Sequence, residues 1–292
     1  MLITMKELLA VAYKEKFAVG SYNVSNSELV RAILTTAEKK KSPAILQIHP
    51  NEINLVGDDF IAYCREAAHR AKVPVVIHLD HGGSIEDISR AIKNGYTSVM
   101  MDASHLPYEE NVALTKEAVQ YAHSVGISVE GELGTIGNTG GSSEGGAEKI
   151  LYTDPDQAKD FVERTNIDTL AVAIGTSHGF YPKDMKPKIQ IDRLQKINEK
   201  VSIPLVLHGG SDNPDQDIRE STKYGIAKIN LSSDMKRAFF NQLRDTLSQK
   251  PEDFEPDVLF PEANEAACKI LEQKMDLFGS TDKAKLYQLS VF

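Results

Sequence analysis

Short runs of apolar and β-branched residues alternate along this chain with longer stretches of amphipathic helical pattern. Strands of a parallel sheet read in this way because both faces of the sheet are buried. The eight runs span residues 17–23, 42–49, 73–80, 97–104, 127–134, 169–175, 203–210 and 226–233. Eight strand–helix units predict an eight-stranded parallel (β/α)₈ barrel, a TIM barrel of the α/β class. An open doubly wound sheet is disfavoured because no GxGxxG motif follows the first strand.

The chain length suits one barrel. Its 292 residues slightly exceed the roughly 250 that are typical of this fold. We therefore expect a single domain over residues 1–292, with a helical C-terminal extension after residue 233. Within that extension, residues 249–264 are predicted to form a loop. Several helix starts carry capping signals, which are Thr4 with Glu7, Ser84 with Asp87, Thr153 or Asp154, and Asn213.

The charge balance limits the classes of partner. A formal net charge of −9 argues against nucleic acid or an anionic membrane, because both need clustered Lys and Arg. The two cysteines, Cys64 and Cys268, provide neither a disulfide framework nor a CxxC site. The N-terminus lacks the apolar core of a signal peptide, and no apolar run is long enough to cross a bilayer. We expect a cytoplasmic protein.

Polar side chains gather at the carboxyl ends of the predicted strands. Barrel enzymes build their active sites at that rim, because the loops that follow the strands meet there. The residues concerned are Asn23, His49, Asp80, His81, Asp102, Glu132, His208 and Asn230, with His178 just beyond the sixth strand. Contributions from nearly every strand favour a shared site over chance.

Three of these rim residues are histidines, and they follow the third, sixth and seventh strands: His81, His178 and His208. Three imidazoles leave one coordination position open, which is typical of catalytic zinc. Nitrogen ligands favour zinc, cobalt or a similar ion over the hard cations that prefer oxygen. His78 faces the same way as Asp80 but lies deeper in the barrel, and we interpret it as a core histidine.

Three rim carboxylates have more than one interpretation. Asp80 directly precedes His81, and alternation along a strand would send the two side chains to opposite sides. A carboxylate beside a metal-bound substrate suits proton transfer. The alternatives for Asp80 are a helix cap or a hydrogen-bond partner of a histidine. Asp102 and Glu132 are predicted either to border a second metal position or to orient the ligands.

A further group of residues predicts a phosphate site. Segments 208–211 (His-Gly-Gly-Ser) and 230–233 (Asn-Leu-Ser-Ser) end the last two strands, and each precedes a helix. Barrels commonly hold phosphate there, on the N–H groups of a helix N-terminus. The candidate residues are Gly209, Gly210, Ser211, Asn230, Ser232 and Ser233, with Gly179 as a further backbone contact.

Several blocks of sequence resemble one enzyme family over almost the whole chain. They include LDHG at 79–82, VEGELGTIG at 129–137, LAVAIGTSHG at 170–179, VLHGGSD at 206–212 and KINLSSDMKRAF at 228–239. These motifs resemble the class II fructose-bisphosphate and tagatose-bisphosphate aldolases. The resemblance implies a zinc-dependent barrel that cleaves a ketose 1-phosphate or 1,6-bisphosphate to dihydroxyacetone phosphate and an aldehyde. It also implies a homodimer or homotetramer, and it places Asp102 and Glu132 beside alternative metal positions.

Carried over to this chain, the resemblance implies zinc binding by His81, His178 and His208. It implies that Asp80 moves the proton of the C4 hydroxyl during cleavage. The residues implied to hold dihydroxyacetone phosphate are Gly179, Gly209, Ser211, Asn230 and Ser233. Co²⁺ or Mn²⁺ is the expected substitute for Zn²⁺, and a monovalent cation, Na⁺ or K⁺, is expected beside the phosphate.

The chain departs from the family pattern mainly where the aldehyde half of the substrate would sit. The glycine-rich loop at 134–146 is shifted, and Glu144 is the candidate donor of the proton that the enediolate takes up. His49 stands where relatives often carry Ser or Thr, and the loop at 181–189 is slightly longer. Asn23 and His49 are therefore candidate substrate contacts, and the identity of the aldehyde stays open.

The same residues bear on two other functions, a zinc hydrolase and a non-catalytic barrel. A zinc hydrolase on this fold would use the metal to make hydroxide, but the first strand lacks the HxH pair that barrel hydrolases often carry. A non-catalytic barrel that assists a partner aldolase is expected to lose its histidines, and all three are retained. Within the aldolases, the alternative is a non-standard ketose 1-phosphate that yields a different aldehyde.

Overall fold

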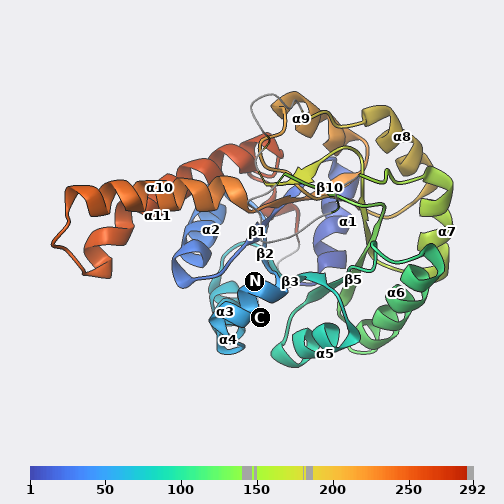
Figure 1. Ribbon diagram of the computed structural model, residues 1–292, viewed down its shortest axis with the longest axis horizontal. Helices are drawn as coiled ribbons and strands as arrows, with labels where there is room; N and C mark the ends of the chain where they lie inside the picture. The colour runs from blue at the N-terminus through green and yellow to red at the C-terminus, as the bar shows by residue number, and fades with distance from the viewer. Residues whose placement is uncertain (140–146, 148–149, 180, 182–186, 288–292) are drawn as a thin grey trace.

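The computed structural model describes residues 1–139, 147, 150–179, 181 and 187–287. Eight parallel strands form a closed barrel in the order β1-β10-β9-β7-β5-β4-β3-β2 (Figure 1). In chain order they are β1 (Val19–Asn23), β2 (Ala44–Ile48), β3 (Val75–Gly82), β4 (Ser98–Met101), β5 (Ser128–Leu133), β7 (Thr169–Val172), β9 (Leu205–Leu207) and β10 (Ile226–Leu231). The predicted (β/α)₈ barrel is confirmed.

Helices cover the outside of the barrel, and several of them begin at the predicted caps. They are α1 (Met5–Glu15), α2 (Ser27–Lys40), α3 (Pro50–Val56), α4 (Asp59–Arg70), α5 (Ile85–Asn94), α6 (Tyr108–His123), α7 (Pro155–Thr165), α8 (Ile191–Lys200), α9 (Asp215–Lys223), α10 (Ser233–Gln249) and α11 (Pro256–Leu277), followed by the short 3₁₀ helix η1 (Ala284–Leu286). Thr4, Ser84 and Asp154 each accept a backbone N–H at a helix start, as predicted.

The predicted cap at Asn213 is wrong. Helix α9 begins at Asp215, and the Asn213 side chain makes no capping bond to it. Its amide donates instead to the carbonyl oxygens of Gly209 (2.6 Å) and Ser211 (2.9 Å). Asn213 therefore shapes the loop that precedes the helix, because a short polar side chain can satisfy a nearby carbonyl as easily as a helix terminus.

The predicted loop at 249–264 is also wrong in its extent. Helix α11 begins at Pro256 and continues through Pro261. Pro256 stands at the start of the helix, where the missing N–H of a proline would have no partner in any case. Pro261 lies inside the helix, where it removes one main-chain hydrogen bond without ending the helix. Helices α10 and α11 pack along each other, and their far end projects beyond the barrel past α2 (Figure 1). Phe254, in the turn between them, is 80% exposed.

Two short segments add a feature that the sequence pattern did not predict. β6 (Gly137–Asn138) and β8 (Ser177–His178) pair in parallel as a separate two-stranded sheet. The predicted sixth strand, 169–175, ends in the structure at Val172. His178 therefore sits on its own pair of strands rather than on a barrel strand.

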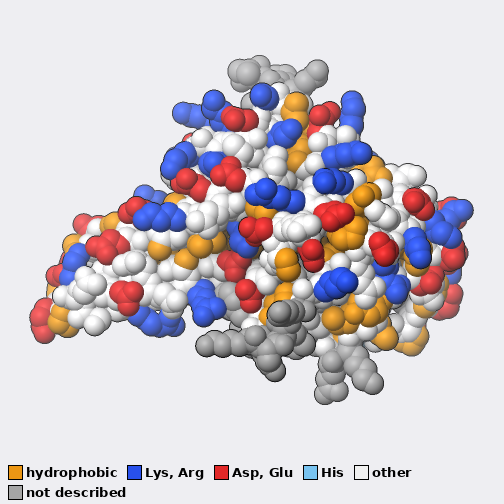
Figure 2. Space-filling model, turned by 90° about the horizontal axis from the view of Figure 1, so that it is seen from above, with side chains coloured by type: hydrophobic (Ala, Val, Ile, Leu, Met, Phe, Trp, Pro, Cys, Tyr) orange, Lys and Arg blue, Asp and Glu red, His pale blue; other side chains and the backbone are white. Residues whose placement is uncertain are grey.

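The surface and the cysteines show few special features. Among the described residues, no helix is long and apolar enough to span a membrane. Basic and acidic side chains are interspersed over the face shown in Figure 2. Cys64 is buried and Cys268 is partly buried, and both are free thiols.

Helix α1 covers the amino-terminal end of the barrel. Its residues Met5, Leu8 and Leu9 are fully buried and belong to one cluster with Val19 and Val76 at the starts of β1 and β3. The backbone N–H of Lys6 also donates to Ser128 Oγ on β5 (3.0 Å). This end of the barrel is thus sealed by apolar packing, which leaves the opposite end for a site.

Shortening a side chain in the apolar cluster under α1 should destabilise the fold without changing the residues at the rim. Leu8→Ala is expected to lower the free energy of unfolding by about 2–5 kcal/mol, because it leaves a cavity in a fully buried cluster. Leu55→Ala is the matched control, because Leu55 is 77% exposed, and it should change stability by less than about 0.5 kcal/mol. Urea unfolding measures the free energy of unfolding of both variants. Equal losses would contradict the claim that apolar packing by α1 closes this end of the barrel.

Candidate active site at the carboxyl ends of the strands

The barrel interior changes from apolar to polar in layers. Residues two apart on a strand face the same way, so the inward-facing residues of one strand lie at successive depths in the barrel. Three strands show this, each read from the α1 end towards the rim. The inward-facing residues are Val19, Ser21 and Asn23 on β1, then Ile45 and Gln47 on β2 with His49 just after it, and Val76, His78 and Asp80 on β3. All nine residues are buried. Going from the α1 end to the rim, the interior becomes polar where chemistry would take place.

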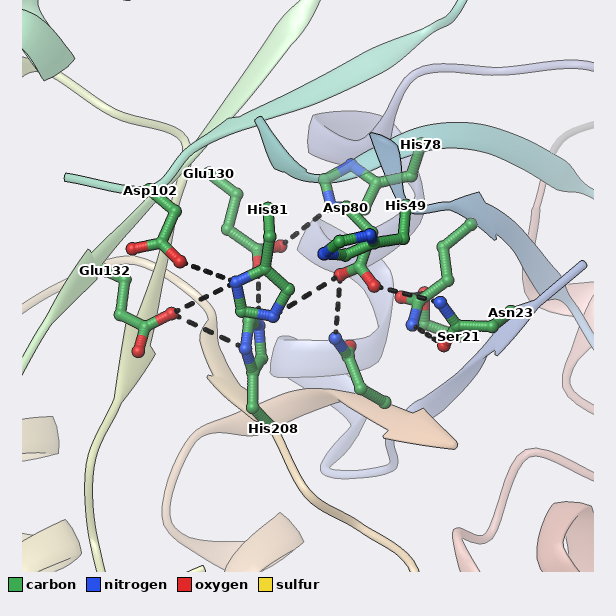
Figure 3. A network of polar contacts seen from close by, with 12 residues as sticks. Ser21, Asn23, His49, His78, Asp80, His81, Asp102, Glu130, Glu132 and His208 are labelled. Atoms are coloured by element: carbon green, nitrogen blue, oxygen red, sulfur yellow. Dashed lines mark hydrogen bonds and ion pairs between the residues drawn. The ribbon is translucent and has the colours of Figure 1, made fainter. Parts of the chain in front are cut away.

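The side chain of His81 does not follow the alternation of its strand. Its backbone lies in the left-handed region (φ 50°), and the pairing of β3 with β4 shifts register between Leu79 and Gly82. Regular alternation predicted that His81 would point away from Asp80, and this prediction is wrong. The bulge turns the ring back into the barrel mouth, where His81 Nε2 lies 3.9 Å from Asp80 Oδ1 (Figure 3).

The structure brings the three predicted histidines together. The ring centroids of His81 and His208 are 4.7 Å apart, those of His81 and His178 are 5.3 Å apart, and those of His178 and His208 are 6.1 Å apart. One ring nitrogen from each residue lies within 4.8 Å of the other two. Strand β3, the residue that follows β9 and the separate segment β8 thus converge on one point.

The residues at this point fit a divalent metal ion. His81 Nε2, His208 Nδ1 and Glu132 Oε2 are buried and make no hydrogen bond within the described part of the chain. Glu132 Oε2 is 3.5 Å from His208 Nδ1. Buried polar atoms without a partner are rare in folded proteins. Imidazole nitrogens beside a carboxylate are ligands that zinc and similar ions prefer.

The electrostatics of His208 and Glu132 agree with this fit. Burial and the positive charge of His81 and Lys228 lower the pKa of His208 well below its usual value, which favours the neutral ligand form. Burial also raises the pKa of Glu132 well above its usual value, and the repulsion of Asp102 adds to this effect. A cation at this point would relieve that repulsion.

Asp102 holds the His81 ring in place. Its Oδ2 lies 2.6 Å from His81 Nδ1, while its Oδ1 accepts from the hydroxyl of Ser104 (2.7 Å). A proton on Nδ1 leaves Nε2 of the neutral ring as the ligand atom. Ligand atoms of His81, Asp102 and Glu132 also lie within 4.8 Å of one another. Both predicted roles, orienting a ligand and bordering a second metal position, are therefore compatible with the geometry.

Asp80 is a buried carboxylate fixed by two amides. Asn23 Nδ2 donates to its Oδ2 (3.0 Å), and Asn230 Nδ2 donates to its Oδ1 (3.2 Å). Burial opposes its ionisation, but the positive charge of His81 and Lys228 outweighs burial and lowers the pKa of Asp80. Asp80 caps no helix, since Ser84 caps the helix that follows. The geometry therefore favours proton transfer over the cap among the predicted alternatives.

His49 has a role that the sequence did not reveal, because it is the N-cap of helix α3. Its Nδ1 accepts the backbone N–H of Asn51 (3.1 Å), and the Glu52 side chain accepts the backbone N–H of His49 (3.0 Å). The neutral ring therefore carries its proton on Nε2. The His49 ring centroid is 6.0 Å from that of His81, so this capped histidine also reaches the mouth.

Glu52 links the mouth to helix α10. It is 6% exposed, accepts from Asn23 Nδ2 (3.2 Å), and pairs with Lys236 Nζ (2.5 Å). Neither Glu52 nor Lys236 was predicted. A capping-box glutamate three residues after His49 was the signal available in the sequence.

The predicted phosphate residues form one connected rim. The backbone N–H of Gly210 donates to the carbonyl of Asn230 (3.0 Å), which joins the ends of β9 and β10. Ser211 is buried, and Ser232 and Ser233 stand at the start of α10. Gly209 has φ 62°, and a Cβ there would lie 2.4 Å from the carbonyl oxygen of Ser177. Glycine is thus required where this loop passes the β6–β8 pair.

A cavity of about 230 Å³ opens beside the histidines. Its lining residues are His81, Asp102, Ser104, His105, Glu132, Thr135, Ile136, Ala147 and His178. Gly179 adopts a left-handed conformation (φ 90°) directly after His178. The predicted proton donor Glu144 lies outside the described residues.

Comparison with known proteins decides the family. The family model for class-II fructose-bisphosphate aldolase matches residues 3–283. The probable fructose-bisphosphate aldolase of Bacillus subtilis is 40% identical over 287 residues, covering 97% of this chain and 99% of that protein. The chain belongs to the class II fructose-bisphosphate aldolase family. The fructose-bisphosphate aldolase of Thermus caldophilus is 39% identical over 305 residues, covering 97% of this chain and all of that protein.

Solved structures agree with this assignment. The YdjI aldolase from Escherichia coli K12 superposes with a TM-score of 0.84 and 36% identity, covering 97% of this chain and all of that one. This protein is therefore an aldolase, a carbon–carbon lyase of a generally metal-dependent family. Family membership decides against the zinc-hydrolase and non-catalytic alternatives.

Gly209, at the rim predicted to hold phosphate, can be compared with Gly126, a glycine in open space. Gly126→Ala should cost roughly 1–2 kcal/mol of unfolding free energy, because φ is 75° there but nothing lies near the new Cβ. Gly209→Ala should cost about 1–3 kcal/mol more, because its Cβ also meets the carbonyl of Ser177. Urea unfolding compares the two variants, and equal losses would show that the contact with β8 is unimportant.

Proposed function

We propose that this aldolase reversibly cleaves a ketose 1-phosphate or 1,6-bisphosphate to dihydroxyacetone phosphate and an aldehyde. One observation carries the proposal. The Asp80 carboxylate, oriented by two amides, lies 3.9 Å from the ring nitrogen of His81 in a cluster of three histidines. A proton acceptor beside an electrophilic centre is what aldol cleavage requires.

For the cofactor, we propose Zn²⁺ held by His81, His178 and His208, with Co²⁺ or Mn²⁺ as substitutes. Bound there, the ion supplies Lewis-acid stabilisation of the negative charge that develops on the ketose oxygens. Asp102 fixes the His81 ring, and Glu132 borders the same point. No Schiff-base lysine is needed for this chemistry.

Asp80 takes the proton of the C4 hydroxyl. The O–H electron pair then forms the carbonyl of the departing aldehyde, and the C3–C4 electron pair stays on the dihydroxyacetone phosphate half. That half takes up a proton at carbon, and we assign the donor to Glu144. In the direction of synthesis the same groups act in reverse.

The two ends of the substrate meet different parts of the rim. We assign the phosphate of dihydroxyacetone phosphate to the backbone and hydroxyls of Gly179, Gly209, Gly210, Ser211, Ser232 and Ser233, with Na⁺ or K⁺ beside it. Asn230 lies between this rim and Asp80, in position for the ketose oxygens. Asn23 donates to the other oxygen of Asp80, and we assign the aldehyde half of the substrate to Asn23 and His49. Tagatose or fructose 1,6-bisphosphate and ketose 1-phosphates with other tails are the candidate substrates.

Removal of the metal ion should abolish cleavage. A panel of ketose phosphates assayed by coupled detection of dihydroxyacetone phosphate should show activity that a strong chelator eliminates and that Zn²⁺ or Co²⁺ restores. Full activity after rigorous chelation would overturn the metal assignment. Release of inorganic phosphate without dihydroxyacetone phosphate would overturn the aldol cleavage.

Replacement of the proton acceptor should affect turnover rather than metal content. Asp80→Asn keeps the volume of the side chain but removes its basicity, and it is expected to lower kcat by about 10²–10⁴-fold. Zinc content, measured by elemental analysis, should stay at the wild-type value. Asp87→Asn in the first turn of α5 is the matched control and should leave kcat unchanged. Normal turnover by Asp80→Asn would rule out this residue as the proton acceptor.

A further inference from the structure

A lysine and a glutamate are buried together inside the barrel, one layer below the rim. Lys228 on β10 and Glu130 on β5 are both fully buried, and Lys228 Nζ lies 3.0 and 3.1 Å from the two Glu130 carboxylate oxygens. Burying two charges is costly, and apolar residues of the same volume often stabilise a fold as well or better. The proposed proton transfer uses neither residue, so their place in the barrel calls for another reason.

The pair contacts one of the candidate metal ligands. Glu130 Oε1 lies 3.0 Å from His208 Nε2 (Figure 3). A carboxylate can only accept, so Nε2 of His208 must carry the proton. The other ring nitrogen, Nδ1, is then unprotonated, and it is the buried atom with no hydrogen bond among the described residues.

The other oxygen of Glu130 is enclosed as well. Thr169 Oγ1 is 3.5 Å from Oε2, and His78 Nε2 is 3.6 Å from it. His78 is itself held by Ser98, whose hydroxyl lies 2.9 Å from its Nδ1. The carboxylate is thus fixed from β3, β7 and β10, and it can present only one orientation to the imidazole of His208.

We propose that the Lys228–Glu130 pair is a positioning device that sets the tautomer and ring orientation of His208, so that Nδ1 is the metal ligand. This inference rests on the proposed function. Glu130 accepts the Nε2 proton, and Lys228 holds the carboxylate in place and balances its charge. Without the pair, a proton on Nδ1 would point into the cluster and block coordination.

A second set of histidine, carboxylate and lysine, at the other end of the barrel, provides a control. His123 Nε2 lies 2.8 Å from Asp168 Oδ2, and Lys6 Nζ lies 3.1 Å from Asp168 Oδ1. This trio repeats the arrangement of histidine, carboxylate and lysine near helix α1, away from the three-histidine cluster. Asp168→Asn should therefore leave the affinity for zinc unchanged.

The test measures zinc affinity of the full chain by competition with a chromophoric chelator. The double variant Glu130→Met with Lys228→Met removes both charges at similar volume and leaves no buried charge unpaired. Its zinc affinity is expected to fall about 10–100-fold. Glu130→Gln with Lys228→Met keeps an acceptor oxygen for Nε2 and should recover part of that loss. A role in packing alone would give both double variants the affinity of the wild type, which would overturn the proposal.

A measurement on the wild-type protein does not depend on the folding of any variant. Long-range ¹H–¹⁵N NMR of the zinc-loaded chain, with His208 assigned, should show the proton on Nε2. A proton on Nδ1 would overturn the inference while leaving the aldolase proposal intact. If the wild-type chain binds no zinc at all, the proposed cofactor fails instead, so the two failures are distinguishable.

Discussion

The closed ring of main-chain hydrogen bonds is the constraint on which the rest of this structure depends. β1 pairs with β2 on one side and with β10 on the other, so the first and last barrel strands are neighbours. Because all the strands are parallel, closure brings every carboxyl end to the same rim. Residues as distant in the chain as Asn23 and Asn230 can then contact the same carboxylate, that of Asp80.

Closure also creates a problem, because polar groups from several strands are pressed together away from water. Asp80, Glu130 and Glu132 are all nearly or fully buried within one barrel. The structure compensates for this concentration of negative charge with amides, imidazoles and the single buried amine of Lys228 among the described barrel residues. Such a centre is stable only when all of its polar groups have partners. The buried ring nitrogens of His81 and His208 mark where a cation would complete it.

Strand periodicity predicted the barrel and most of the rim residues, because the positions of the strands and the direction of their side chains follow from the same alternation. Alternation also places Glu130 below Glu132 and Lys228 below Asn230, and it could have revealed the inner polar layer. It failed at His81, where a bulge reverses one side chain, and it did not reveal that the His49 ring, which does follow the alternation, also caps a helix. Both features depend on backbone conformation at a strand end, which periodicity does not record.

The left-handed backbone at His81 has a consequence for how the enzyme can move. Asp80 and His81 are joined by a single peptide bond, and the bulge turns both side chains into the same space. No rearrangement of the surrounding loops can separate them, so entry and departure of substrate need not disturb the chemical step. Evolution can therefore exchange the loops around the mouth and alter which substrate is accepted. It cannot change the length of β3 by one residue without losing both groups at once.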